Sequence, residues 1–173
     1  MLSLSEISVI EEANSFGCEG LGVALDKLLE RWNYGLTDNE TFIRIVFLKW
    51  YSISEPNWYN GLPDKLEISL EDFIKQRSNN LPLNGEEKFI IGVLSHNFAW
   101  CFGDENKWKE KAIELLVDAS VEDSLVFSNW KYLLAISDEV NGLRKNINTE
   151  LHARFNGRGE MGHYLLHILN RTK

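Results

Sequence analysis

Two histidines near the C-terminus have the spacing of metal ligands on a helix. His163 and His167 are four residues apart and Glu160 precedes them by three, so one helix face could present two imidazoles to a metal. His96 and His152 stand alone, and no motif supplies a third ligand. We therefore interpret the pair as structural side chains of a terminal helix, and we predict neither a metal nor another cofactor.

The other reactive residue types lack the sequence contexts of catalytic sites. No serine stands in a Gly-x-Ser-x-Gly motif. The segment 158–162, Arg-Gly-x-x-Gly, has no strand before it and no Gly-Lys-Ser/Thr ending, so its glycines indicate a turn and close helix packing rather than a phosphate loop. Adjacent acids such as Glu86 and Glu87 fall at predicted helix starts, where they complement the helix dipole. These patterns favour a protein that is not an enzyme.

The 173-residue chain has a formal charge of −8 that is unevenly distributed. Residues 1–143 hold 24 acids and 12 bases, whereas residues 144–173 hold 2 acids and 6 bases. An acidic body argues against direct nucleic-acid binding, which needs a basic surface, and is compatible with a basic protein partner. We expect the C-terminal bases Arg144, Arg154 or Arg158 to pair with acids of neighbouring helices.

The cysteines and the N-terminal segment indicate in which cellular compartment the protein is expected. Cys18 and Cys101 are far apart and no Cys-x-x-Cys pair is present, which favours two free buried thiols over a disulfide. The segment 1–14 lacks the basic region and long apolar run of a signal peptide. No apolar run approaches the ~20 residues of a membrane-spanning helix. We therefore expect a cytoplasmic protein without a membrane partner.

The stretch 37–62 is the segment around which we expect the other elements to pack. Thr37 and Glu40 have the spacing of a capping box, which predicts a helix start. From there to Ile53 the chain is apolar on almost every side of the predicted helix, as in a buried helix. Pro56 ends it, because the residue before a proline is disfavoured in the helical conformation. The predicted core is centred on Phe47, Trp50, Ile91, Leu94, Phe98 and Trp108.

Helical periodicity recurs along the chain, and no stretch alternates apolar and polar residues as a strand would. Only Gly103 and Asp104 separate two of the predicted helices, which makes those helices antiparallel neighbours. We predict an all-α fold, a compact single domain over 1–173 with about eight helices stacked as antiparallel hairpins. After a short helix capped by Ser3 or Ser5, the predicted helices are 21–32, 38–53, 69–77, 84–102, one opened by Asp104, 122–136, 138–154 and 162–169.

In such a stack, successive loops alternate between two ends of the molecule. The loops near 54–68, 102–105 and 137–139 would share one end, with exposed aromatics ringed by acids. That composition is typical of a binding surface for a basic protein. The alternative is that these acids merely begin helices and that Trp58 packs into the core. The candidate binding residues are Glu55, Trp58, Tyr59, Asp64, Glu67, Asp104, Glu105, Asp138 and Glu139.

Two segments resemble parts of small α-helical bacterial proteins. These are FLKWYSISEPNWYNGL, from Phe47 to Leu62, and RGEMGHYLLHIL, from Arg158 to Leu169. Some of those proteins look like immunity proteins encoded beside polymorphic or contact-dependent growth-inhibition toxins. The resemblance implies a small antidote that binds one toxin domain, often a nuclease, and blocks its active site. It carries over no binding residue, because such families diversify their contact surfaces.

The sequence therefore leads us to expect an immunity protein that neutralises a cognate toxin domain, such as a basic RNase, by covering its active site. Nuclease clefts are basic because they hold phosphates, so acidic side chains suit them. The alternative is a helical-repeat scaffold or adaptor that binds another protein. An enzyme with a metal at His163 and His167 is a third class of function.

Overall fold

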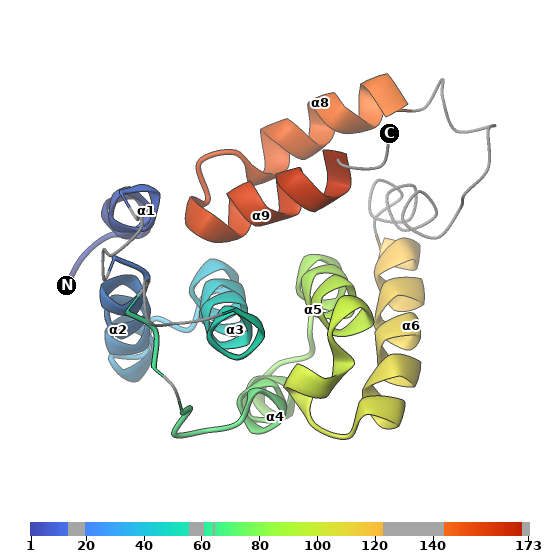
Figure 1. Cartoon of the computed structure of the whole chain (residues 1–173), viewed down its shortest axis with the longest axis horizontal. Helices are drawn as coiled ribbons and strands as arrows, with labels where there is room; N and C mark the ends of the chain where they lie inside the picture. Colours follow the sequence, from blue (N-terminus) through green and yellow to red (C-terminus); the bar gives the residue numbers. More distant parts are fainter. Residues whose placement is uncertain (14–19, 56–60, 64, 123–143, 171–173) are drawn as a thin grey trace.

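The computed structural model describes residues 1–13, 20–55, 61–63, 65–122 and 144–170, and this part of the chain is helical without any strand (Figure 1). The predicted all-α class is confirmed. The predicted helix 122–136 and the loop near 137–139 lie outside the described residues. The helices are α1 Leu4–Glu12, α2 Gly20–Asn33, α3 Asn39–Ser54, α4 Leu70–Asn80, α5 Gly85–Asn97, the 3-10 helix η1 Ala99–Phe102, α6 Glu105–Glu122, α8 Arg144–Phe155 and α9 Gly159–Asn170.

Helix α3 lies in the middle of the fold, as the sequence predicts. It packs against α2, α4, α5 and α9, and Figure 1 shows these helices on different sides of it. Every side chain from Thr41 to Trp50 is buried. Five of the six predicted core residues are buried, and the sixth, Phe98, is half-buried with its ring centroid 5.6 Å from that of Trp50. None of the helices that the structure describes is long and apolar enough to cross a bilayer.

Local capping explains most helix starts. Ser3, Ser69 and Asn84 cap α1, α4 and α5 through side-chain oxygens that accept backbone N–H groups, as predicted. The capping box predicted for Thr37 and Glu40 is wrong, because the carboxylate of Asp38 takes that role. It accepts the backbone N–H of Thr41 at 2.9 Å and the Thr41 hydroxyl at 2.8 Å.

The helix predicted over 84–102 is interrupted. Helix α5 ends at Asn97, Phe98 adopts φ −142° and ψ 63°, and η1 follows. Gly103 then takes φ +133°, a conformation that a side chain rarely tolerates. This turn leaves the Trp100 side chain 52% exposed, although the apolar pattern places it in a buried helix. The sequence contains no capping signal at Phe98 that would have revealed the break.

Helices α3 to α6 alternate in direction, as the hairpin prediction requires. The end of α4 meets the starts of α3 and α5, because Arg77 donates to the Asn39 side chain and to Glu87, each at 3.0 Å. Helices α5 and α6 are antiparallel. At one end of the pair, Gly85 lies beside Glu122; further along, a Cβ on Gly92 would lie 2.8 Å from Leu116 Cγ. That glycine permits the close approach of the two helices.

Candidate functional site

The predicted acidic end forms in part. The ring contact between Trp50 and Phe98 brings together the ends of α3 and α5. Lys107 Nζ lies 2.6 Å from Glu71 Oε1, which joins the starts of α6 and α4 at the same end. Of the nine candidate residues, Glu55, Glu67, Asp104 and Glu105 are described here. Trp58, Tyr59, Asp64, Asp138 and Glu139 lie outside the described residues.

Some of the acidic side chains at this end already form local hydrogen bonds or ion pairs. Asp104 caps α6 by accepting the backbone N–H of Lys107 at 2.8 Å. The Glu105 carboxylate pairs with Lys109 at 2.5 Å. Glu55 is half-buried and directly follows α3 as its C-cap residue, and Glu67 is exposed. The described part of this end is therefore a surface of mixed charge, with Trp100 as an exposed aromatic residue that the sequence analysis assigned to a buried helix.

A second acidic surface lies along the outward side of α6. Ile113, Val117 and Val121 are exposed by 49%, 44% and 84%, and a spacing of four residues places them in one row. A parallel row of exposed acids runs beside them. We call these six residues the α6 outer face: Glu110, Ile113, Glu114, Val117, Asp118 and Val121.

The charges of the α6 outer face are only weakly compensated. Within the part of the chain that the structure describes, neither Glu110 nor Glu114 forms an ion pair, and Asp118 lies 3.7 Å from Lys88 Nζ. Lys88 is itself engaged more closely by Glu122, at 2.6 Å. An exposed row of branched apolar side chains beside carboxylates that are unpaired or only weakly paired is suited to a partner with both apolar and basic groups.

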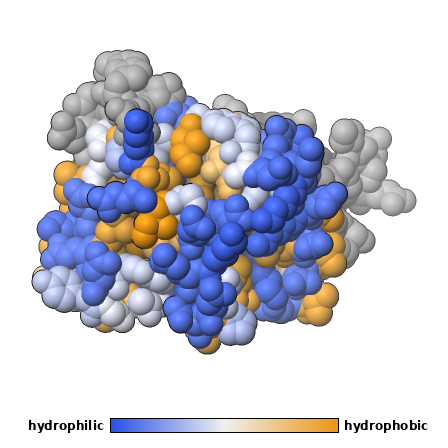
Figure 2. Space-filling view, turned by 90° about the horizontal axis from the view of Figure 1, so that it is seen from below, coloured by the Kyte–Doolittle hydropathy of each residue, from blue (hydrophilic) through white to orange (hydrophobic). Residues whose placement is uncertain are grey.

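A hollow of about 370 Å³ lies between α2, α4 and the segment that leads into α4. Figure 2 shows hydrophobic surface gathered in the left half of the face that contains it, whereas the right half is mostly polar. Its lining residues are Leu25, Asp26, Leu29, Trp32, Asn33, Lys49, Pro63, Lys65, Leu66, Glu67, Ile68, Phe73 and Gln76. Burial lowers the pKa of the Lys49 ammonium, and the charge of Glu67 opposes part of that shift.

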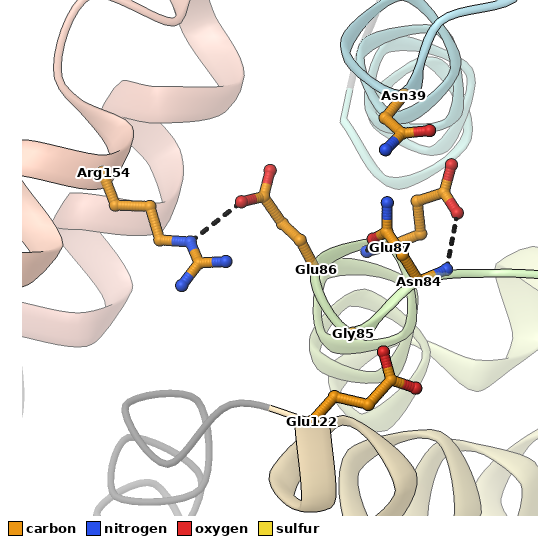
Figure 3. A pocket seen from close by; sticks show the side chains of 7 residues that line it. All are labelled: Asn39, Asn84, Gly85, Glu86, Glu87, Glu122 and Arg154. Atoms are coloured by element: carbon orange, nitrogen blue, oxygen red, sulfur yellow. Dashed lines mark hydrogen bonds and ion pairs between the residues drawn. The ribbon is translucent and has the colours of Figure 1, made fainter.

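A second hollow, of about 320 Å³, is lined by several glutamates, and basic side chains pair with them. Figure 3 shows Glu86 and Arg154 pointing toward one another across it, and their Oε2 and Nε atoms are 2.8 Å apart. Arg158 also pairs with Glu86 and with Glu40, which confirms the predicted pairing of C-terminal arginines. These arginines hold the pKa of Glu86 below its ordinary value, against the opposing effect of burial. The remaining acids of the hollow are likewise paired, Glu87 with Arg77 and Glu122 with Lys88.

The histidine pair occupies an exposed position on α9. His163 and His167 are both exposed, and His163 Nδ1 lies 4.0 Å from Glu160 Oε2. The described residues contain no group of three or more potential ligands arranged for a metal ion. The preceding glycines serve the turn and the packing, as predicted. Gly159 has φ +62°, and a Cβ on Gly162 would lie 2.1 Å from the Phe155 carbonyl oxygen.

Comparison with known protein families, curated proteins and solved structures finds no match for this chain.

Proposed function

We propose that this protein is an immunity protein of the bacterial cytoplasm that binds and neutralises a basic toxin domain, such as an RNase. The observation that supports the proposal best is the α6 outer face, where Glu110 and Glu114 flank exposed Ile113, Val117 and Val121. A nuclease holds phosphates in a basic cleft, so a surface rich in carboxylates can occupy that cleft. The apolar row would then supply the desolvated centre of the interface.

The two parts of the α6 outer face would act on different rate constants. Long-range attraction between its carboxylates and a basic partner accelerates the encounter and is weakened by salt. Packing of Val117 and its neighbours acts only after contact, so it governs dissociation. Asp104 and Glu105 at the start of the same helix, together with exposed Trp100, would extend the contact toward the predicted acidic end.

The test begins with the domain encoded by the adjacent gene, produced with and without this protein. We expect that domain to be toxic alone and harmless when the two are co-produced. Glu110→Lys/Glu114→Lys should slow association at low salt by about tenfold. Glu12→Lys/Glu150→Lys is the matched control, because it changes two exposed acids on other helices and shifts the net charge equally.

Val117→Asp should instead raise the dissociation rate, with little change in the association rate. Equal association rates for the two double variants would place the binding surface elsewhere on the molecule. A non-toxic neighbour, or a toxic one that this protein neither binds nor neutralises, would refute the immunity function and favour a scaffold or adaptor role.

A further inference from the structure

Lys49 differs from the other buried cations of the described part. Arg44 and Arg77 each meet a buried carboxylate, that of Glu11 at 2.5 Å and that of Glu87 at 3.0 Å. Lys49 is only 5% exposed, yet among the described residues its ammonium has a single hydrogen-bond acceptor, the Ile68 carbonyl oxygen at 3.3 Å. A buried charge that forms no ion pair is unfavourable, so an anion bound beside Lys49 would stabilise this position.

The surroundings of Lys49 have the composition of a ligand site. Its side chain lines the hollow of about 370 Å³, a volume within the usual range for small-molecule pockets. Leu25, Leu29 and Trp32 form an apolar wall from α2. Opposite α2, the ring of Phe73 has its centroid 5.6 Å from Lys49 Nζ. The hollow therefore combines one buried cation with a wall that suits an aromatic or alkyl group.

Other charges around the hollow do not satisfy Lys49. The carboxylates of Asp26 and Glu67 also line it, and within the described residues neither forms an ion pair with the Lys49 ammonium, whereas Lys65 carries the same charge as Lys49. Lys65 and Glu67 are exposed, so water screens their charges more than it screens that of buried Lys49. An incoming carboxylate would thus find its strongest interaction at Lys49.

We propose that this hollow binds a small organic carboxylate whose aromatic or alkyl body packs on α2 while its carboxylate pairs with Lys49. A carboxylate accepts charge-assisted hydrogen bonds from the ammonium donors that the Ile68 carbonyl leaves available. The apolar body would pack on Leu29 and Trp32, which are only partly buried, and would remove their exposed surface from water. This site is separate from the α6 outer face and does not depend on the proposed function.

Two ligands with the same phenylbutyl body, one ending in a carboxylate and the other in a neutral hydroxyl group, test the proposal. The full chain is titrated with 4-phenylbutyrate and with 4-phenylbutan-1-ol, by calorimetry and by the change in total tryptophan fluorescence, to which Trp32 in the wall of the hollow contributes. We expect the acid to bind at one site per chain, about tenfold or more tightly than the alcohol, because its hydrogen bonds to Lys49 are charge-assisted. Failure of the acid to bind at about 10 mM, or equal affinities for acid and alcohol, would overturn the proposal.

Substitutions locate the effect at Lys49. Lys49→Met keeps the approximate length of the side chain and removes its charge, so this variant should no longer bind the acid more tightly than the alcohol. Lys65→Met, at an exposed lysine of the same hollow, should retain the preference for the acid. Lys49→Met should also raise the urea midpoint of the ligand-free protein, because it removes a buried charge. Persistence of the preference in Lys49→Met would refute the assignment, and if that variant does not fold, the wild-type comparison alone decides.

Discussion

Removing the arginine of the buried Glu11–Arg44 pair should destabilise the protein far more than breaking an exposed pair of equal length. The two side chains are each 1% exposed, and their oxygen and nitrogen atoms are 2.5 Å apart. Glu105 and Lys109 are also 2.5 Å apart, but are 54% and 58% exposed. Arg44→Met and Lys109→Met therefore compare a buried with an exposed ion pair of the same length, although Arg44 also donates to the Leu4 carbonyl oxygen at 3.1 Å.

The expected magnitudes follow from the different environments. Arg44→Met leaves the Glu11 carboxylate buried without its cation, which should lower the free energy of unfolding by about 3–5 kcal/mol. Lys109→Met removes a solvated pair and should cost less than about 1 kcal/mol. With a urea m-value of about 2 kcal/mol/M, Arg44→Met lowers the midpoint by roughly 1.5–2.5 M. Urea unfolding followed by far-UV circular dichroism at pH 7 measures both changes.

The pH dependence provides an independent check. Burial raises the pKa of Glu11 and the Arg44 charge opposes that rise, so Arg44→Met should raise the pKa further. A carboxyl with a higher pKa in the folded state binds more protons there than in the unfolded chain, so stability falls as pH increases. The penalty of Arg44→Met should therefore be smaller at pH 5 than at pH 7.

A double variant separates the lost charge from the lost hydrogen bond. Glu11 Oε2 accepts the backbone N–H of Glu160 at 2.8 Å, and Glu11→Gln keeps an oxygen that can fill this role. Glu11→Gln/Arg44→Met should be more stable than Arg44→Met alone, because no buried charge remains. The reasoning would be refuted if Arg44→Met lost no more stability than Lys109→Met, or lost the same amount at pH 5 and pH 7.

Two further predictions concern the core. Trp50→Ala should lower the free energy of unfolding by about 3–5 kcal/mol and Phe98→Ala by less, because Trp50 is fully buried and Phe98 only half-buried. Chemical unfolding of the two variants measures both losses. Equal losses would contradict the burial assigned to Phe98. Burial raises the pKa of the Cys101 thiol to about 12. In a Cys18→Ser variant at pH 8, this thiol should therefore react with a disulfide reagent much more slowly in the folded protein than in urea. Similar rates in the two conditions would show that the thiol is accessible in the folded protein.

Much of the fold is predictable from local sequence because its determinants are close together along the chain. Ser3, Ser69 and Asn84 each cap a helix by accepting a backbone N–H three residues ahead. The short connection at Gly103 and Asp104 predicts that the helices on either side are antiparallel, and α5 and α6 are antiparallel although η1 lies between α5 and that connection. The density of apolar residues in α3 predicts its burial, since a helix without a polar face cannot be placed at a surface.

The locations of the charged and exposed groups depend on tertiary structure. Helical periodicity predicts a buried Trp100, whereas the turn at Phe98 leaves it exposed. Arg44 meets Glu11 across 33 positions of the chain, and Arg158 meets Glu40 across 118. Lys49 shares the same apolar helix as Arg44, yet only packing determines that one faces a carboxylate and the other a hollow. Capping and periodicity act within a few residues, whereas ion pairs and hollows form between helices that the sequence alone does not bring together.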